Sequence, residues 1–111
     1  MKLTVKDKEY SLKLSIAAAI DLEAELGNNP VNVLFSEMSI NESGALPHIR
    51  TLAKIFYYCL KVNKDMTFSK AVEIMEEYLD TEDIRELMMV LIKCLQESGL
   101  IPRGEELPNV M

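Results

Sequence analysis

The fold is decided by residues 3–27, which read LTVKDKEYSLKLSIAAAIDLEAELG. In the first half of this segment, apolar residues alternate with polar ones on both sides of a short polar break at Asp7 and Lys8. A period of two is typical of strands that place one face on a core, so the segment predicts a β-hairpin. Because an isolated hairpin is only marginally stable in water, we expect it to pack against the helices that follow.

The second half of the segment predicts a helix from Ile16 to Leu26. Ser15 is a good N-cap because its hydroxyl oxygen can accept a free backbone N–H. The residues after it are rich in strong helix formers. Gly27 can take the positive φ that ends many helices. An asparagine cap and a proline at the first helical position then predict a short second helix over residues 30–38.

Three further helices are predicted from apolar residues at helical spacing. The first runs from about Pro47 to Val62, the second follows a Thr67 cap, and the third begins after residues 80–81 and ends at Gly99. The polar stretch 39–45 is interpreted as an exposed loop, and residues 102–111 as a mobile C-terminal tail.

These elements predict a mainly α (α+β) fold. An N-terminal β-hairpin packs on a bundle of four to five helices, in a single domain over residues 1–101. A chain of 111 residues is long enough for one cooperative core without disulfide or metal staples.

Charge and composition narrow the classes of function. The chain has 18 acidic and 12 basic residues, which gives a formal net charge of −6. A phosphate backbone is repelled by such a molecule, so we expect no nucleic-acid partner. The first four residues lack the long apolar stretch of a signal peptide, and no window approaches the ~20 apolar residues of a membrane span. We therefore expect a cytoplasmic protein without membrane contact, whose two cysteines stay reduced.

The residue types that catalyse reactions or bind metals lack the neighbours they need. His48, the single histidine, has neither a nucleophile nor an orienting partner beside it in the sequence. Cys59 and Cys94 each lie in an apolar stretch, which makes a thiol inert. The carboxylates between residues 73 and 86 lack the ligand spacing and central glycine of a calcium loop. We predict no enzymatic activity, no cofactor and no metal.

Two helices carry apolar residues on a second face. Counted at 100° per residue, three residues of the helix over 47–62 lie roughly 180–240° away from Ile49, which we place on the core stripe. Two residues of the last helix likewise lie far from its core stripe. A helix that is apolar on two faces is either central in its own domain or covered by another chain, and the sequence period is compatible with both. The candidate residues for partner binding or self-association are Ile55, Tyr58, Val62, Met89 and Val90.

The order of these patterns resembles a known family. A hairpin is followed by a helix with Ala-Ile-Asp-Leu-Glu at 19–23 and Leu-Gly at 26–27, then Asn-Pro at 29–30 and a series of amphipathic helices in an acidic chain. This pattern is similar to the tail assembly chaperones of long-tailed, siphovirus-type bacteriophages and of prophages in Gram-positive bacteria. The resemblance extends along most of the chain and is sharpest over residues 10–30.

The resemblance implies a non-catalytic role in virion morphogenesis. Such chaperones bind the long helical tape measure protein, keep it soluble and help tail tube subunits to assemble around it. They act in the cytoplasm of the bacterial host and are generally absent from the mature virion. Many also exist in a longer form made by a programmed ribosomal frameshift. The implied partners are the tape measure protein and the tail tube protein, and we also expect a homo-oligomer.

A small regulatory module, such as a repressor or antitoxin that binds DNA or a toxin protein, is the alternative. It requires a compact helix-turn-helix with a basic recognition helix. The helix over 47–62 aligns Arg50, Lys54 and Lys61 on one side, but the net charge of −6 opposes binding to DNA.

Overall fold

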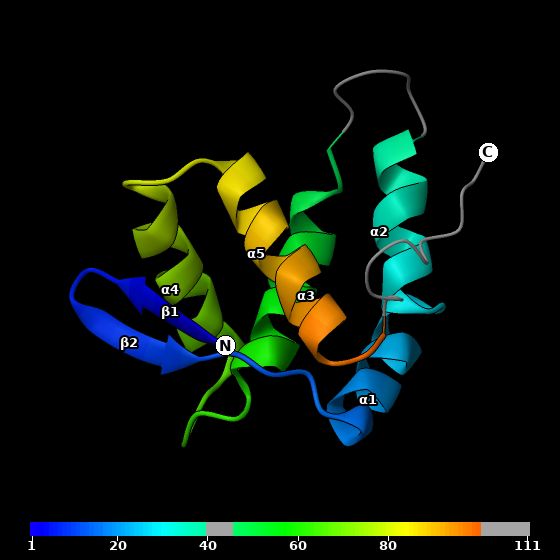
Figure 1. Cartoon of the computed structure of the whole chain (residues 1–111), viewed down its shortest axis with the longest axis horizontal. Coiled ribbons are helices and arrows are strands. Elements are labelled where there is room, and N and C mark those ends of the chain that lie inside the picture. Colours follow the sequence, from blue (N-terminus) through cyan, green and yellow to red (C-terminus); the bar gives the residue numbers. More distant parts are fainter. Residues whose placement is uncertain (40–45, 101–111) are drawn as a thin grey trace.

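A two-stranded antiparallel hairpin precedes five helices in the computed structural model, which describes residues 1–39 and 46–100 (Figure 1). This arrangement confirms the predicted mainly helical fold with an N-terminal hairpin. The predicted loop lies, from residue 40 onward, outside the described residues, and so does the predicted tail over 102–111. The elements are β1 (Lys2–Val5), β2 (Lys8–Ser11), α1 (Ile16–Leu26), α2 (Pro30–Ser39), α3 (Ile49–Leu60), α4 (Phe68–Leu79) and α5 (Ile84–Glu97).

The hairpin turns one residue earlier than the sequence predicts. Val5 pairs with Lys8, so the two turn residues are Lys6 and Asp7, with φ angles of 48° and 70°. A two-residue turn with positive φ at both positions matches the right-handed twist of the strands. The polar break at residues 6–9 does not itself show where the turn begins, and the backbone twist decides it.

The chain between β2 and α1 joins the hairpin to the helices. Leu12 and Leu14 are both 1% exposed and continue the inward face of the hairpin into the core. The backbone N–H of Lys13 donates to the carbonyl oxygen of Cys59 at 3.0 Å, near the end of α3. The chain that leaves the hairpin is thus held to the helices by a backbone hydrogen bond as well as by buried side chains. Such support is needed because a hairpin alone is only marginally stable in water.

Helix ends follow the local chemistry of the sequence. The side chains of Ser15 and Thr67 accept the backbone N–H groups of Ala18 and Lys70, each at 3.1 Å, so both caps are confirmed. Asn29 accepts the N–H of Val31 at 2.8 Å and begins α2 in the same way. Gly27 and Gly99 have φ angles of 79° and 84°, the left-handed conformation expected after a helix.

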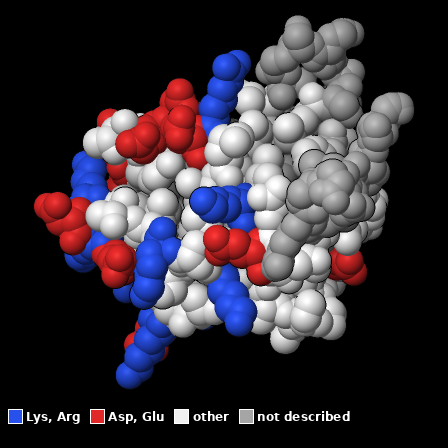
Figure 2. Space-filling model, in the orientation of Figure 1, with Lys and Arg blue, Asp and Glu red and all other residues white. Residues whose placement is uncertain are grey.

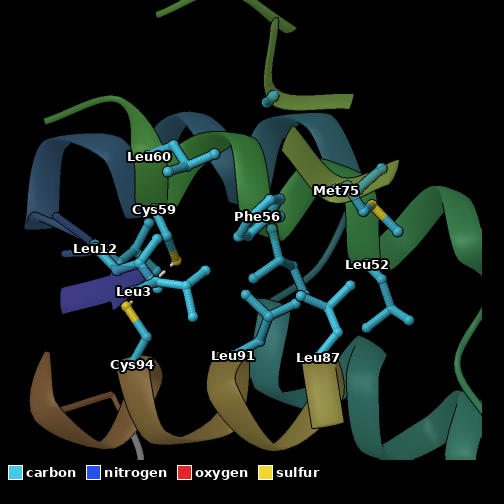
Figure 3. Close-up of a cluster of buried hydrophobic side chains, with 14 of the residues drawn as sticks. Leu3, Leu12, Leu52, Phe56, Cys59, Leu60, Met75, Leu87, Leu91 and Cys94 are labelled. Atoms are coloured by element: carbon cyan, nitrogen blue, oxygen red, sulfur yellow. Dashed lines mark hydrogen bonds between the residues drawn. The ribbon is translucent and has the colours of Figure 1, made fainter. Parts of the chain in front are cut away.

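Helix α3 is the centre of the helical bundle. It packs against α1, α2, α4 and α5, and Leu52, Phe56 and Leu60 are fully buried on it (Figure 3). Ile49 was predicted to share this stripe, but it is 61% exposed. The prediction is wrong for Ile49 because it is the first residue of α3, at the end of the buried stripe, although at 100° per residue it falls between the buried Phe56 and Leu60.

None of the helices in the described part of the chain combines the length and apolarity that a membrane crossing requires.

Candidate partner-binding surface

The structure separates the five residues predicted for partner binding. Ile55 is 0% exposed and belongs to the core. Its predicted place on a partner-facing stripe is therefore wrong, because the helices packed around α3 cover the position of Ile55. Tyr58 is half-buried and Val62 is 48% exposed. Of the two residues of α5, Met89 is 58% exposed and Val90 is half-buried.

Tyr58 and Val62 meet at a groove of about 260 Å³ between α1 and α3. Ala17 and Asp21 line its opposite side from α1. Burial, with the nearby carboxylates of Glu25 and Asp21, raises the pKa of Tyr58. This α1–α3 groove, as we call it, contains only two of the predicted residues; Met89 and Val90 lie on another helix and do not line it. The complete lining is Lys13, Ser15, Ala17, Ala18, Asp21, Tyr58, Lys61 and Val62.

Aromatic side chains continue this surface toward α4. A second hollow of about 180 Å³ is lined by Tyr57, Tyr58 and Phe68 together with Glu25 and Lys54. Tyr57 contacts Tyr58 with ring centroids 5.1 Å apart and Phe68 edge-on at 5.6 Å. Phe68 is 45% exposed, as the first residue of α4. Amphipathic aromatic rings of this kind are favoured at protein interfaces.

Two of the basic residues considered for DNA binding are engaged within the molecule. Lys54 forms an ion pair with Glu25 at 3.4 Å. The Nζ of Lys61 lies 5.5 Å and 5.0 Å from the ring centroids of Tyr57 and Tyr58. Other helices also cover much of α3. A recognition helix, by contrast, exposes its basic side chains to the DNA groove, so α3 does not resemble one.

A third apolar feature was missed by the sequence analysis. Ile16 and Ile20 on α1 are 63% and 61% exposed, and Ala17 and Ala24 beside them are exposed as well. We call these four residues the α1 stripe. Figure 2 shows uncharged surface at the lower right, where α1 lies. The sequence signal was that α1 is apolar on two faces, as is typical of a helix covered on both, whereas here α1 packs mainly against α2 and α3.

The single histidine has a partner that is distant in sequence. The carboxylate of Glu37 on α2 accepts the backbone N–H of His48 at 2.8 Å and the hydroxyl of Thr51 at 3.0 Å. The Nδ1 atom of His48 lies 3.3 Å from the same carboxylate. His48 is the N-cap of α3 but makes no side-chain cap bond, and the Glu37 carboxylate lies at the positive end of the helix instead. The contacts fasten α2 to α3.

The two cysteines meet in the core between α3 and α5 (Figure 3). The Sγ atoms of Cys59 and Cys94 lie 3.4 Å apart in a thiol hydrogen bond. This bond, together with burial, raises the pKa of Cys59 well above its ordinary value. A protonated, buried thiol is a poor nucleophile, which agrees with the structural role expected from its apolar sequence context.

Acidic side chains gather along the outer face of α4, but they form no ligand set. Glu73, Glu76, Glu77 and Asp80 line a shallow depression, and Asp80 forms an ion pair with Lys6 at 2.8 Å. Within residues 1–39 and 46–100, no three His, Cys, Asp or Glu side chains are placed to hold a metal ion.

No protein-family model matches this sequence, and comparison with curated proteins and with solved structures finds no match.

Proposed function

We propose that this protein is a non-catalytic tail assembly chaperone that binds the tape measure protein and promotes assembly of the tail tube. The observation that carries the proposal is a set of large apolar side chains left exposed by an acidic molecule. Exposed apolar side chains that lie close together mark protein interaction sites, while a net charge far from zero keeps the protein soluble. In the described part of the chain the exposed large apolar residues are Ile16, Ile20, Phe35, Leu46, Ile49, Val62, Phe68 and Met89. Of these, Ile16 and Ile20 lie one turn apart on α1 and Val62 lines the adjoining groove, whereas Met89 lies on α5 and does not line it.

The strength of the expected contact suits a temporary partner. Covering one of these half-exposed side chains stabilises a complex by about 1–2 kcal/mol, so four together supply roughly 4–8 kcal/mol. Ordering two molecules in a complex costs roughly 4–15 kcal/mol. A single contact is therefore weak and reversible, and a long client that offers the contact repeatedly is held by avidity. Reversible binding is what a chaperone absent from the mature virion requires.

The partners follow from the same proposal. The tape measure protein is an apolar helical client, and the tail tube protein is recruited to it in the cytoplasm of the bacterial host. We include self-association of this chain on the client in the proposal. The proposed role involves no catalytic step and no cofactor.

Co-expression with helical segments of the tape measure protein tests the proposal. We expect the soluble fraction of such a segment to rise when the two chains are made together, and the pair to co-elute in size-exclusion chromatography with light scattering. An unrelated acidic helical protein of similar size serves as the control. A client that stays insoluble, or soluble chains that elute separately, would rule the function out.

A further inference from the structure

Helix α1 combines its apolar stripe with charge of one sign. Its three charged residues are Asp21, Glu23 and Glu25, and it contains no lysine or arginine. At 100° per residue the α1 stripe covers about 0–100° from Ile16, with Glu23 at about −20° and Asp21 at about 140°. A carboxylate therefore borders the stripe on each side. Glu25 lies farther round and is paired with Lys54 at 3.4 Å.

We propose that the α1 stripe and the adjoining α1–α3 groove bind one amphipathic α-helix of a partner protein, whose apolar face is flanked by lysine or arginine. The inference deepens the proposed function and rests on it for the identity of the partner as the tape measure protein.

The shape of the surface fits a helix. Ile16, Ile20 and Ala24 follow one another at intervals of four residues, so the stripe runs along the axis of α1 for about 12 Å. Ala17 and Ala24 have short side chains, which let a partner backbone approach closely. The groove of about 260 Å³ beside them can accept a row of partner side chains, in the way that the ridge of one helix packs beside another.

Charge selects a basic partner over a second copy of this chain. Each copy carries a net charge of −6, so two copies repel each other before contact, whereas a basic helix is attracted. Lys13 and Lys61 also line the groove, and Lys61 is already held over the tyrosine rings. Asp21 shares the groove with these two lysines, so we expect the basic residues of the partner to lie beside Glu23, on the side of the stripe away from the groove.

Synthetic peptides test the inference on the full chain. The probe is a fluorescein-labelled helical peptide of about 18 residues with leucines on one face and lysines on its flanks. A second peptide replaces every lysine with glutamate. Fluorescence anisotropy reports binding by the wild-type protein, by Ile20→Glu, and by the matched control Met89→Glu. Ile20 and Met89 are similarly exposed, at 61% and 58%, and both substitutions add one negative charge.

We expect the basic peptide to bind and the acidic peptide not to bind. Ile20→Glu should weaken binding by at least about tenfold although it adds attractive charge, because it removes an apolar contact at the centre of the site. Met89→Glu should change the affinity by less than about twofold. Thermal unfolding of each variant confirms that it is folded.

Several results would overturn the inference. Equal binding of the two peptides, or equal effects of the two substitutions, would show that the contact is not at α1. A wild-type dimer that Ile20→Glu converts to a monomer in sedimentation equilibrium would identify a second copy as the occupant. If tape measure segments bind wild type and both variants alike, the inference fails and the proposed function stands. If the basic peptide binds through Ile20 but no tape measure segment binds, the function fails instead.

Discussion

The side-chain amide of Asn63 bonds to both backbone groups of Ser11, which lies 52 residues earlier in the chain. Its Oδ1 accepts the N–H of Ser11 at 3.1 Å, and its Nδ2 donates to the carbonyl oxygen of Ser11 at 2.8 Å. The same Nδ2 also donates to the carbonyl oxygen of Leu60 at 2.8 Å, at the end of α3. The side chain of Asn63 thus forms hydrogen bonds both with the last residue of β2 and with the last residue of α3.

Removing this amide should loosen the hairpin from the bundle. Asn63→Ala deletes three hydrogen bonds, each worth about 0.5–1.5 kcal/mol, so we expect the free energy of unfolding to fall by about 1.5–4.5 kcal/mol. Asn63→Asp keeps the acceptor but faces two carbonyl oxygens with a carboxylate, so it should be at least as destabilising at neutral pH. Urea unfolding measures both variants. A loss below about 0.5 kcal/mol for Asn63→Ala would show that water replaces the amide.

The position of the hairpin turn predicts a substitution that stabilises the protein. Asp7 has a φ angle of 70°, which glycine adopts without steric cost, so Asp7→Gly should raise the free energy of unfolding by about 0.5–1 kcal/mol. Lys8→Gly is the control, because Lys8 begins β2 and glycine weakens a strand. If both substitutions stabilise the protein in thermal unfolding, the turn lies one residue later, as the sequence pattern suggested.

Two residues predicted on the second apolar face of the helix over 47–62 should respond differently to truncation. Ile55→Ala empties a fully buried site and should cost about 2–4 kcal/mol. Val62→Ala alters a side chain that is 48% exposed and should cost no more than about 0.5 kcal/mol. Urea titrations of the two variants compare these losses. Similar losses would mean that Val62 belongs to the core as well, which would remove it from the α1–α3 groove.

Alkaline pH should destabilise the protein partly through Tyr78. Burial, with the nearby carboxylates of Glu82 and Glu86, raises the pKa of this phenol in the folded state. Because the folded pKa lies above the unfolded one, the stabilisation is fully present below about pH 10 and is lost as pH rises through the folded pKa. The unfolding free energy of wild type should therefore fall more steeply above about pH 10 than that of Tyr78→Phe. Parallel pH profiles would show that the phenol titrates alike in both states.

The sequence predicts best those features that depend on neighbouring residues in the chain, such as helix ends. The caps at Ser15, Asn29 and Thr67 and the left-handed Gly27 depend on residues within one turn of each helix end, and the structure has all four. Ile55 could not be placed in this way, because its burial depends on how many helices surround α3.

Only part of the candidate site could be predicted from the sequence, because the rest depends on how the helices pack. Tyr58 and Val62 were found from their position on a second apolar face, and the structure brings them together in one groove. The α1 stripe was missed because α1 is apolar on two opposite faces, so the sequence does not show which face is covered and which is open. Its open face exists only because α1 packs mainly against α2 and α3.

The most direct test of the account is a calorimetric titration of this full chain with a helical segment of the tape measure protein. We predict saturable binding by wild type and by Met89→Glu, with dissociation constants that agree within about twofold. For Ile20→Glu we predict binding weaker by at least about tenfold. A wild-type chain that gives no binding heat with any segment, at more than one temperature, and leaves the segment insoluble would contradict the account.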